Sequence, residues 1–312
     1  MIQRTLGKSG LRTSLLGLGC NNFGWTIDAT RAQEVVHKAL DLGITTFDEA
    51  NVYGGAQGNS EEILGGILGS RRKDVTLITK FGYDESTPGN RNTSRRHIIQ
   101  AAEISLKRLR TDWIDVYMLH WPDAQTPMDE TLRALNDLVH SGKVRYIACS
   151  NLSAWQVVNA RWISRQAGLS AFVAAESEYS VLVRGVEAEL IPALQAEGMG
   201  LLPYFPLASG LLTGKFKRGE PLAETRLASN ALKLGDRYLT DANFDKVETL
   251  TAFAKERGHS LLDLAFAWLA ARPVVSSVIA GATSPAQLDA NAKAISWDLT
   301  ADEVAQIDAL TA

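Results

Sequence analysis

Four residues whose side chains can share acid–base chemistry stand at or soon after the ends of apolar runs: Asp48, Tyr53, Lys80 and His120. A phenol has a pKa of about 10, and a neighbouring ammonium lowers it because the positive charge favours the phenolate. Asp48 would supply the counter-charge that a buried lysine needs, and an imidazole can orient a substrate carbonyl by hydrogen bonding. The four residues therefore predict a site in which Tyr53 protonates a carbonyl oxygen.

Each of these residue types has an ordinary role when it is taken singly. An acid can end a turn, an aromatic or imidazole ring can pack in the core, and a lysine can extend its amine to the surface. Three further apolar runs also end in polar residues, at Ser150-Asn151, Glu176 and Tyr204. Such a series of polar strand ends favours one lined site over isolated turn residues.

The apolar runs alternate with longer amphipathic stretches along the whole chain. They are continuous rather than alternating, as expected of parallel strands buried on both faces. The runs span residues 15–19, 44–47, 75–79, 114–119, 144–149, 172–175, 199–203 and 274–280. Eight repeats of strand and helix predict a (β/α)8 TIM barrel, in which the carboxyl ends of the strands share one face and build the site.

Start signals precede several of the amphipathic stretches. They are Thr30, Thr126-Pro127, Ser153 and the capping-box pattern Ser284-Pro285-Ala286-Gln287. We expect a single domain over residues 1–312, with an N-terminal hairpin in residues 2–14 closing the barrel bottom. Residues 206–240, after the seventh strand, form a long polar loop, and a loop of this length is usually functional.

Composition excludes some classes of protein. The chain has 312 residues, of which 46% are hydrophobic and 21% charged, and its formal net charge is -3. This balance gives no sign of a nucleic-acid or anionic-membrane partner. The first apolar run is broken by Gly17 and Gly19 and is too short to span a bilayer. We expect a cytoplasmic protein in which Cys20 and Cys149 are reduced, inert thiols.

A cofactor must complete the chemistry, because neither a protein nucleophile nor a set of metal ligands accompanies the four residues. A hydride from a nicotinamide cofactor would do so. The glycine-rich stretch 17–24 lacks GxGxxG spacing, and 210–216 has the wrong glycine spacing for a phosphate loop. The helix start at 281–284 is a better phosphate site, because free N–H groups at a helix N-terminus attract anions.

Several motifs resemble, in this order, those of the aldo-keto reductase family: FDEANVYG, LITKFG, MLHWPD, IACSN, SEYS, PYFPLASGLLTGK and IAGATSPAQLDAN. The opening QRTLGKSGLRTSLLGLGCNNFG is similar to the family's N-terminus, so the resemblance runs nearly end to end. It is greater to the bacterial and channel-subunit-like members than to the mammalian aldose reductases. It implies an NADPH-dependent barrel enzyme, with NADH as the alternative cofactor, that reduces aldehydes, ketones or sugars.

The resemblance also implies roles for individual residues. The catalytic tetrad would be Asp48, Tyr53, Lys80 and His120, with tyrosine as general acid tuned by the lysine–aspartate pair. Ser150 and Asn151 would hold the nicotinamide carboxamide, and Tyr204 would stack on the ring. The further cofactor-binding residues would be Gly19, Cys20, Asn21, Asp48, Glu176 and Phe205, then Leu207, Ser209 and Leu211 along the pyrophosphate, Lys215 and Arg226 at phosphates, and Gly281, Thr283, Gln287 and Asn291 at the adenosine end.

The chain departs from the family pattern at several of these positions. Glu176 replaces the usual Gln, and a carboxylate can accept from the carboxamide NH2 but cannot donate to its oxygen. Glu49 and Cys20 each stand where Thr is common. Gln287 stands where some members have Arg, which weakens the case for strict NADPH preference. Gln287 is also fully explained as part of a capping box.

Aromatic side chains after strand ends could line an apolar substrate pocket. Trp25, Tyr83 and Trp121 are the candidates, beside Tyr53 and His120. We expect a small-molecule carbonyl or alcohol substrate, which the sequence does not identify further, and it names no protein partner.

Two other functions compete with carbonyl reduction. The chain could be a regulatory or scaffold subunit that binds the nicotinamide cofactor and docks to another protein with weak or no turnover. The paired Lys80 and Asp48 favour the enzyme, because docking alone has little need of them. A Schiff-base enzyme using Lys80 is disfavoured, because an adjacent acid raises the lysine pKa when that chemistry needs it lowered.

Overall fold

The strands form a parallel barrel in the computed structural model, which describes residues 1–55, 57–219 and 234–311. The neighbours in this eight-stranded sheet follow one another in the order β10-β3-β4-β5-β6-β7-β8-β9. The strands are β3 (Leu16–Gly19), β4 (Thr46–Asp48), β5 (Thr76–Phe81), β6 (Ile114–Leu119), β7 (Val144–Ser150), β8 (Ala174–Glu178), β9 (Gly200–Tyr204) and β10 (Val278–Gly281). All seven neighbouring pairs are parallel, so the predicted TIM barrel is confirmed.

The barrel closes between β9 and β10 through a short bridge rather than a long ladder. The run predicted as one strand from residue 274 to 280 is regular only from Val278. Its first part makes an isolated parallel bridge between Val275 and Leu201. The Leu201 N–H donates to the Val274 carbonyl at 2.8 Å, and the Ser276 N–H donates to the Leu201 carbonyl at 2.9 Å.

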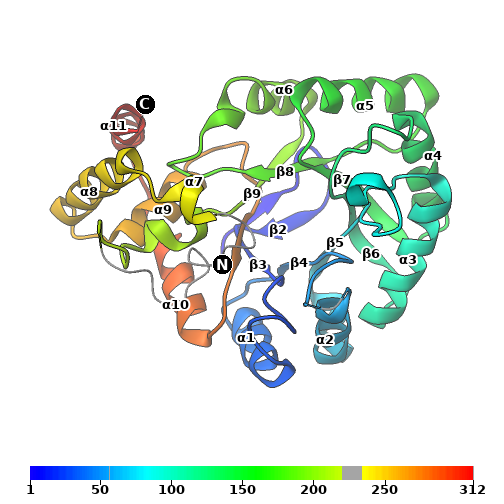
Figure 1. The fold of residues 1–312 in the computed structure, drawn as a ribbon, viewed down its shortest axis with the longest axis horizontal. Helices are drawn as coiled ribbons and strands as arrows, with labels where there is room; N and C mark the ends of the chain where they lie inside the picture. The colour runs from blue at the N-terminus through cyan, green and yellow to red at the C-terminus, as the bar shows by residue number, and fades with distance from the viewer. Residues whose placement is uncertain (56, 220–233, 312) are drawn as a thin grey trace.

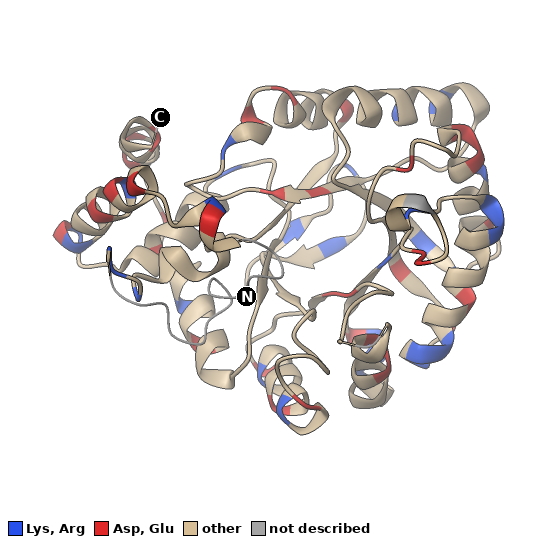
Figure 2. Cartoon of the chain, viewed as in Figure 1, with Lys and Arg blue, Asp and Glu red and all other residues tan. Residues whose placement is uncertain are grey.

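Helices surround the strands, as Figure 1 shows. They are α1 (Ala29–Asp41), α2 (Asn59–Leu68), α3 (Arg95–Leu109), α4 (Met128–His140), α5 (Ala154–Ala167), α6 (Leu190–Glu197), α7 (Leu234–Tyr238), α8 (Asp241–Glu256), α9 (Leu261–Ala270), α10 (Pro285–Ala294) and α11 (Ala301–Leu310). Lysine and arginine are interspersed with aspartate and glutamate over these outer helices (Figure 2). Among the described residues, no helix is both long and apolar enough to cross a bilayer.

The helix starts confirm some of the predicted signals and correct others. Ser153 caps α5 in a capping box with Gln156, as expected. For α1 the cap is Asp28 and not Thr30, because the Asp28 carboxylate accepts from the Arg31 N–H at 2.8 Å. Pro127 occupies the N-cap of α4 rather than its first helical position.

The pattern at the start of α10 is only half a capping box. The Ser284 hydroxyl accepts from the Gln287 N–H at 3.3 Å. The Gln287 side chain, however, accepts from the Thr283 N–H at 2.8 Å instead of the N-cap N–H.

The barrel lumen has its own small apolar core beneath the strand ends. Its buried members are Leu6, Ile78, Val116, Met118, Ala148, Ala174, Leu202 and Ile279. Leu6 comes from the N-terminal hairpin of β1 (Gln3–Thr5) and β2 (Arg12–Ser14), which pair antiparallel as predicted. A side chain at Gly7, where φ is +57°, would meet the Val173 carbonyl at 2.5 Å, so the turn fits tightly against the strands. The hairpin therefore closes the bottom of the barrel.

The long segment after β9 is not uniformly polar. It begins with a 3-10 segment, η4 (Ala208–Thr213), whose Ala208, Leu211 and Leu212 are buried. The predicted loop therefore has an apolar base packed on the core. Residues 220–233 lie outside the described part of the chain, and α7 follows them.

Candidate active site

Strand alternation explains why the site residues face the lumen. Ile78, Met118, Ala148, Ala174 and Leu202 belong to the lumen core. Successive side chains of a strand point to opposite faces, so the residue two positions further along each strand faces the lumen too. These next residues are Lys80, His120, Ser150, Glu176 and Tyr204. An apolar layer therefore lies directly below a polar layer built by the same strands.

Lys80 lies at the centre of the polar layer and is fully buried. Its Nζ donates to Asp48 Oδ1 at 2.5 Å, to the Tyr53 hydroxyl at 3.3 Å and to the Glu49 carbonyl at 3.3 Å. Burial opposes the charged amine, but the carboxylates of Asp48 and Glu176 outweigh it and hold the pKa of Lys80 well above its usual range. Lys80 is therefore an ammonium, and a Schiff-base role is disfavoured.

Tyr53 reaches Lys80 from the loop after β4. The expectation that the ammonium lowers the pKa of the phenol is wrong for this environment. Burial raises the pKa of the Tyr53 phenol above its usual range, and the opposing effect of the Lys80 ammonium does not reverse this. Asp48 and Glu176 add negative charge that also disfavours the phenolate. The net shift is therefore upward rather than downward, and Tyr53 is a protonated donor at neutral pH.

His120 packs beside Tyr53 as a neutral ring. The two ring centroids lie 5.9 Å apart in an edge-to-face arrangement, and the Trp121 ring stacks on His120 with centroids 3.4 Å apart. Burial, followed by the positive charges of Lys80 and Arg91, holds the pKa of His120 well below its usual range. Its Nδ1 is buried without a hydrogen-bond partner. A neutral imidazole with an unused nitrogen can still bind a substrate oxygen or hydroxyl.

Glu176 brings a second carboxylate to Lys80. Its Oε2 lies 3.4 Å from Lys80 Nζ, an ion-pair distance, but this oxygen is buried and has no hydrogen-bond donor. Burial and the nearby Asp48 raise the pKa of Glu176 to about 8, against the opposing effect of Lys80. One buried ammonium thus lies between two acids.

The sequence comparisons agree with this geometry. A model of the aldo/keto reductase family matches residues 15–312. This chain belongs to the aldo/keto reductase family.

Several relatives match this aldo/keto reductase over nearly its full length. It is 40% identical over 301 residues to a probable voltage-gated potassium channel subunit beta of Oryza sativa subsp. japonica, covering 95% of this chain and 91% of the relative. It is 35% identical over 319 residues to L-glyceraldehyde 3-phosphate reductase of Escherichia coli (strain K12), covering 99% and 92%. It is 37% identical over 304 residues to an uncharacterized oxidoreductase of Bacillus subtilis (strain 168), covering 94% and 91%. The chain is therefore an oxidoreductase of a family that reduces carbonyls, and the predicted resemblance is confirmed.

Around the tetrad, this aldo/keto reductase holds the predicted carboxamide residues in one network. Asn151, with φ at +60°, donates to the His120 carbonyl and to the Ser150 hydroxyl, both at 3.0 Å. Its Oδ1 accepts from the Tyr204 hydroxyl at 2.8 Å, and Ser150 is the sheet neighbour of Glu176. The network fixes these side chains at the strand ends before any ligand binds.

The predicted residues after β9 fall into two groups. Of the predicted residues, Phe205 and Ser209 have positive φ, as does Ala208 between them, and the Ser209 hydroxyl is buried without a hydrogen-bond partner. Leu211 is fully buried in the core, so only its backbone is available to a ligand. Leu207 is partly buried against the same core.

Two residues in this region, Lys215 and Arg226, were predicted to bind phosphate. Lys215 lies 5.0 Å above the Phe216 ring. Arg226 lies outside the described residues.

The predicted adenosine-end residues lie beside β3. Gly281 pairs with Gly19 across the sheet. A side chain at Gly281 would approach Asn22 at 3.1 Å and Asn21 at 3.5 Å. Cys20 is a free, buried thiol in the core, as is Cys149, so Cys20 offers only its backbone.

On α10, the predicted residues already interact with one another. The Thr283 hydroxyl donates to Gln287 Oε1 at 3.2 Å, and Gln287 is exposed. Asn291 is buried one helical turn further along α10. The geometry therefore brings Thr283 and Gln287 into contact, while the binding roles of all four adenosine-end candidates stay predictions.

The candidate substrate residues separate into an exposed and a packed group. Trp25 is 52% exposed. The Tyr83 and Trp121 ring centroids are 6.4 Å apart. Arg91, which sequence reasoning missed, lies 4.1 Å above the Trp121 ring and adds positive charge near His120. No signal in the sequence identified Arg91, because it stands within a loop rather than at a strand end.

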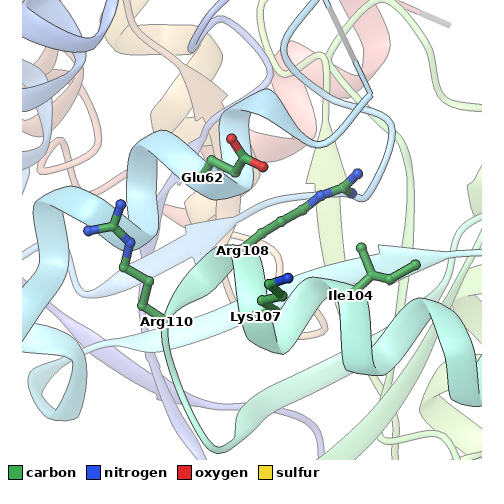
Figure 3. Close-up of a pocket in the computed structure, with 5 residues that line it drawn as sticks. All are labelled: Glu62, Ile104, Lys107, Arg108 and Arg110. Atoms are coloured by element: carbon green, nitrogen blue, oxygen red, sulfur yellow. The ribbon is translucent and has the colours of Figure 1, made fainter.

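A separate hollow of about 380 Å³ lies between α2 and α3, outside the lumen. Figure 3 shows its lining residues, which are Glu62, Ile104, Lys107, Arg108 and Arg110. Arg108 already contacts Glu61 and the Gln57 carbonyl. None of these residues belongs to the tetrad or the predicted cofactor set. Within the described residues, no cluster of His, Cys, Asp or Glu is arranged to hold a metal ion.

Proposed function

We propose that this aldo/keto reductase uses NADPH to reduce aldehydes, ketones or sugars to alcohols, with Tyr53 as the proton donor. The observation that carries the proposal is the 3.3 Å contact of the Tyr53 hydroxyl with Lys80 Nζ, which Asp48 holds at 2.5 Å. Few other functions need a phenol, an ammonium and an acid joined in this way at the mouth of a barrel. A reduced nicotinamide, when bound, would supply the hydride for the carbonyl carbon.

Tyr53 gives its proton to the carbonyl oxygen as that oxygen gains negative charge. Its raised pKa keeps the phenol protonated until the substrate demands the proton. Lys80 then stabilises the phenolate, and Asp48 keeps the ammonium in place. Solvent restores the proton to Tyr53 after the alcohol leaves.

His120 orients the carbonyl in this scheme. Since burial and nearby cations keep the ring neutral, its free nitrogen can bind a substrate oxygen without adding a charge. Stacking on Trp121 fixes the ring plane. The aromatic pair Tyr83–Trp121 and the exposed Trp25 would border the substrate.

The residues present fit a nicotinamide dinucleotide. Glu176 Oε2, which receives no hydrogen bond, can accept from a carboxamide NH2, and the Ser209 hydroxyl, also without a hydrogen-bond partner, can bind a phosphate oxygen. Ser150, Asn151 and Tyr204 would complete the nicotinamide end. Lys215 and the Thr283 N–H, at the start of α10, would serve the phosphate and adenosine end.

The second candidate function is a cofactor-binding regulatory or scaffold subunit. Its support is that relatives from rice and other organisms carry the name of potassium channel beta subunits. The intact Tyr53–Lys80–Asp48 contact favours the enzyme, because binding without turnover does not need a positioned proton donor.

A substrate panel tests the proposal. Aldehydes, ketones, sugars and steroids are offered with NADPH and with NADH, and the nicotinamide absorbance is followed. Turnover of at least one class, faster with NADPH, is the expected result. Tight cofactor binding without turnover of any class would instead favour the regulatory subunit.

A further inference from the structure

Glu176 gives the site a charge that the tetrad alone would not have. The Asp48 carboxylate already neutralises Lys80 at 2.5 Å, and Glu176 lies 3.4 Å from the same nitrogen. When Glu176 is ionised, this buried group carries one net negative charge. Water does not screen it, because Glu176 is 3% exposed and Lys80 is fully buried.

The groups that face Glu176 come from four elements. They are Asp48 on β4, Tyr53 after β4, Lys80 on β5 and Tyr204 on β9. Lys80 is the single cation of this set, and Asp48 already offsets it. The extra negative charge therefore acts on whatever lies against Tyr53 and Lys80.

We propose that Glu176 makes this site prefer the oxidised, cationic form of the nicotinamide cofactor, and that binding this form expels a proton from Glu176. The inference rests on the proposed function, because the ring that donates hydride must lie beside the carbonyl that Tyr53 protonates. Oxidised and reduced forms differ by one positive charge on that ring and otherwise share their contacts. Only a charged neighbour can discriminate strongly between them.

The sign of the pH dependence follows from the burial of Glu176. Its pKa is raised to about 8, mainly by burial, so a large fraction of the free enzyme carries a neutral Glu176 at neutral pH. The oxidised ring favours the ionised acid and lowers that pKa, so binding releases a proton. The neutral reduced ring has no such effect. Preference for the oxidised form should therefore increase as the pH rises toward about 8 and level off above that value.

The test measures dissociation constants of NADP+ and NADPH with the full chain, in wild type and Glu176→Gln, from mildly acidic to mildly alkaline pH. Gln keeps the shape of the side chain and removes its charge. Glu61→Gln is the matched control, because Glu61 is another buried acid with a raised pKa, but it contacts Thr79 and Arg108. Proton release is measured by titration calorimetry in buffers of different ionisation enthalpy.

We expect the preference of wild type for NADP+ over NADPH to grow about tenfold across this pH range. In Glu176→Gln the preference for NADP+ over NADPH should not change with pH. In Glu61→Gln it should change with pH as it does in wild type. Proton release on NADP+ binding should disappear only in Glu176→Gln. Equal pH dependence in wild type and Glu176→Gln, with both cofactors bound, overturns the inference and leaves the proposed function standing. Failure of wild type to bind either cofactor overturns both.

Discussion

Two adjacent layers of the barrel lumen, built by the same strands, have opposite character. In the lower layer Ile78 and Met118 pack in an apolar core with Leu6. Two residues further along the same strands, Lys80 and His120 are equally buried but polar. Burial of the apolar side chains in the lower layer stabilises the folded state, whereas burial of the polar side chains in the upper layer destabilises it.

The upper layer also leaves polar atoms without partners. Glu176 Oε2 and His120 Nδ1 are buried and have no hydrogen-bond partner. Each such atom costs about 1–3 kcal/mol of stability. Burial in the lower layer therefore stabilises the barrel, whereas the upper layer keeps polar groups at a cost in stability, as the proposed function requires.

The largest effect is expected from Lys80→Met, which removes the cation of the upper layer. Turnover should fall by about 10²–10⁴-fold, because Tyr53 loses the charge that stabilises its phenolate. Stability should also fall by about 3–5 kcal/mol, because Asp48 becomes a buried charge without a partner. Steady-state kinetics and denaturant unfolding measure the two effects. The control is Lys143→Met, a surface lysine paired with Glu103, which should change neither quantity appreciably.

The next largest effect is expected from a substitution in the lower layer, which should lower stability and leave turnover unchanged. Met118→Ala should destabilise the protein by about 2–5 kcal/mol, because it leaves a cavity in the lower layer. Turnover per folded molecule should stay near that of wild type. Ile104→Ala on α3, at a position 49% exposed, should change stability by less than about 0.5 kcal/mol. A large loss of turnover in folded Met118→Ala would show that the layers are not separable.

The smallest effect concerns Glu49, a fully buried acid beside Asp48. Burial raises the pKa of Glu49 well above its usual range, so the folded state favours the protonated acid. Its stabilising contribution is therefore present below the unfolded pKa and is lost as the pH rises through the folded pKa. Glu49→Gln should be more stable than wild type by about 1–3 kcal/mol at alkaline pH. The two curves of unfolding free energy should converge at acidic pH, and parallel curves would contradict the account.

Much of the fold and the convergence of the tetrad could be predicted from the sequence. Continuous apolar runs mark buried parallel strands, and a polar residue at the end of a strand keeps its inward direction whatever surrounds it. This is why Lys80 and His120 were predicted to share one face. Closure of the barrel through Val275 and Leu201 was not predictable, because a single bridge leaves no pattern in the sequence.

The pKa shifts in the site could not be predicted from the sequence either. The pKa of Tyr53 is raised rather than lowered, because burial of the phenol and the carboxylates of Asp48 and Glu176 together outweigh the effect of the Lys80 ammonium. Neither the depth of a group nor a contact between β5 and β8 can be read from residue order. The partner of Gln287, which is Thr283 and not the N-cap, likewise depends on the turn geometry.

The central claim is that Tyr53 is the proton donor of the site. Its most direct measurement is single-turnover hydride transfer in Tyr53→Phe, with NADPH affinity determined on the same sample. The substitution removes one hydroxyl and keeps the ring that packs against His120. We predict unchanged NADPH binding and a hydride-transfer rate at least about 100-fold lower than in wild type. A rate equal to that of wild type, with NADPH bound, would contradict the account.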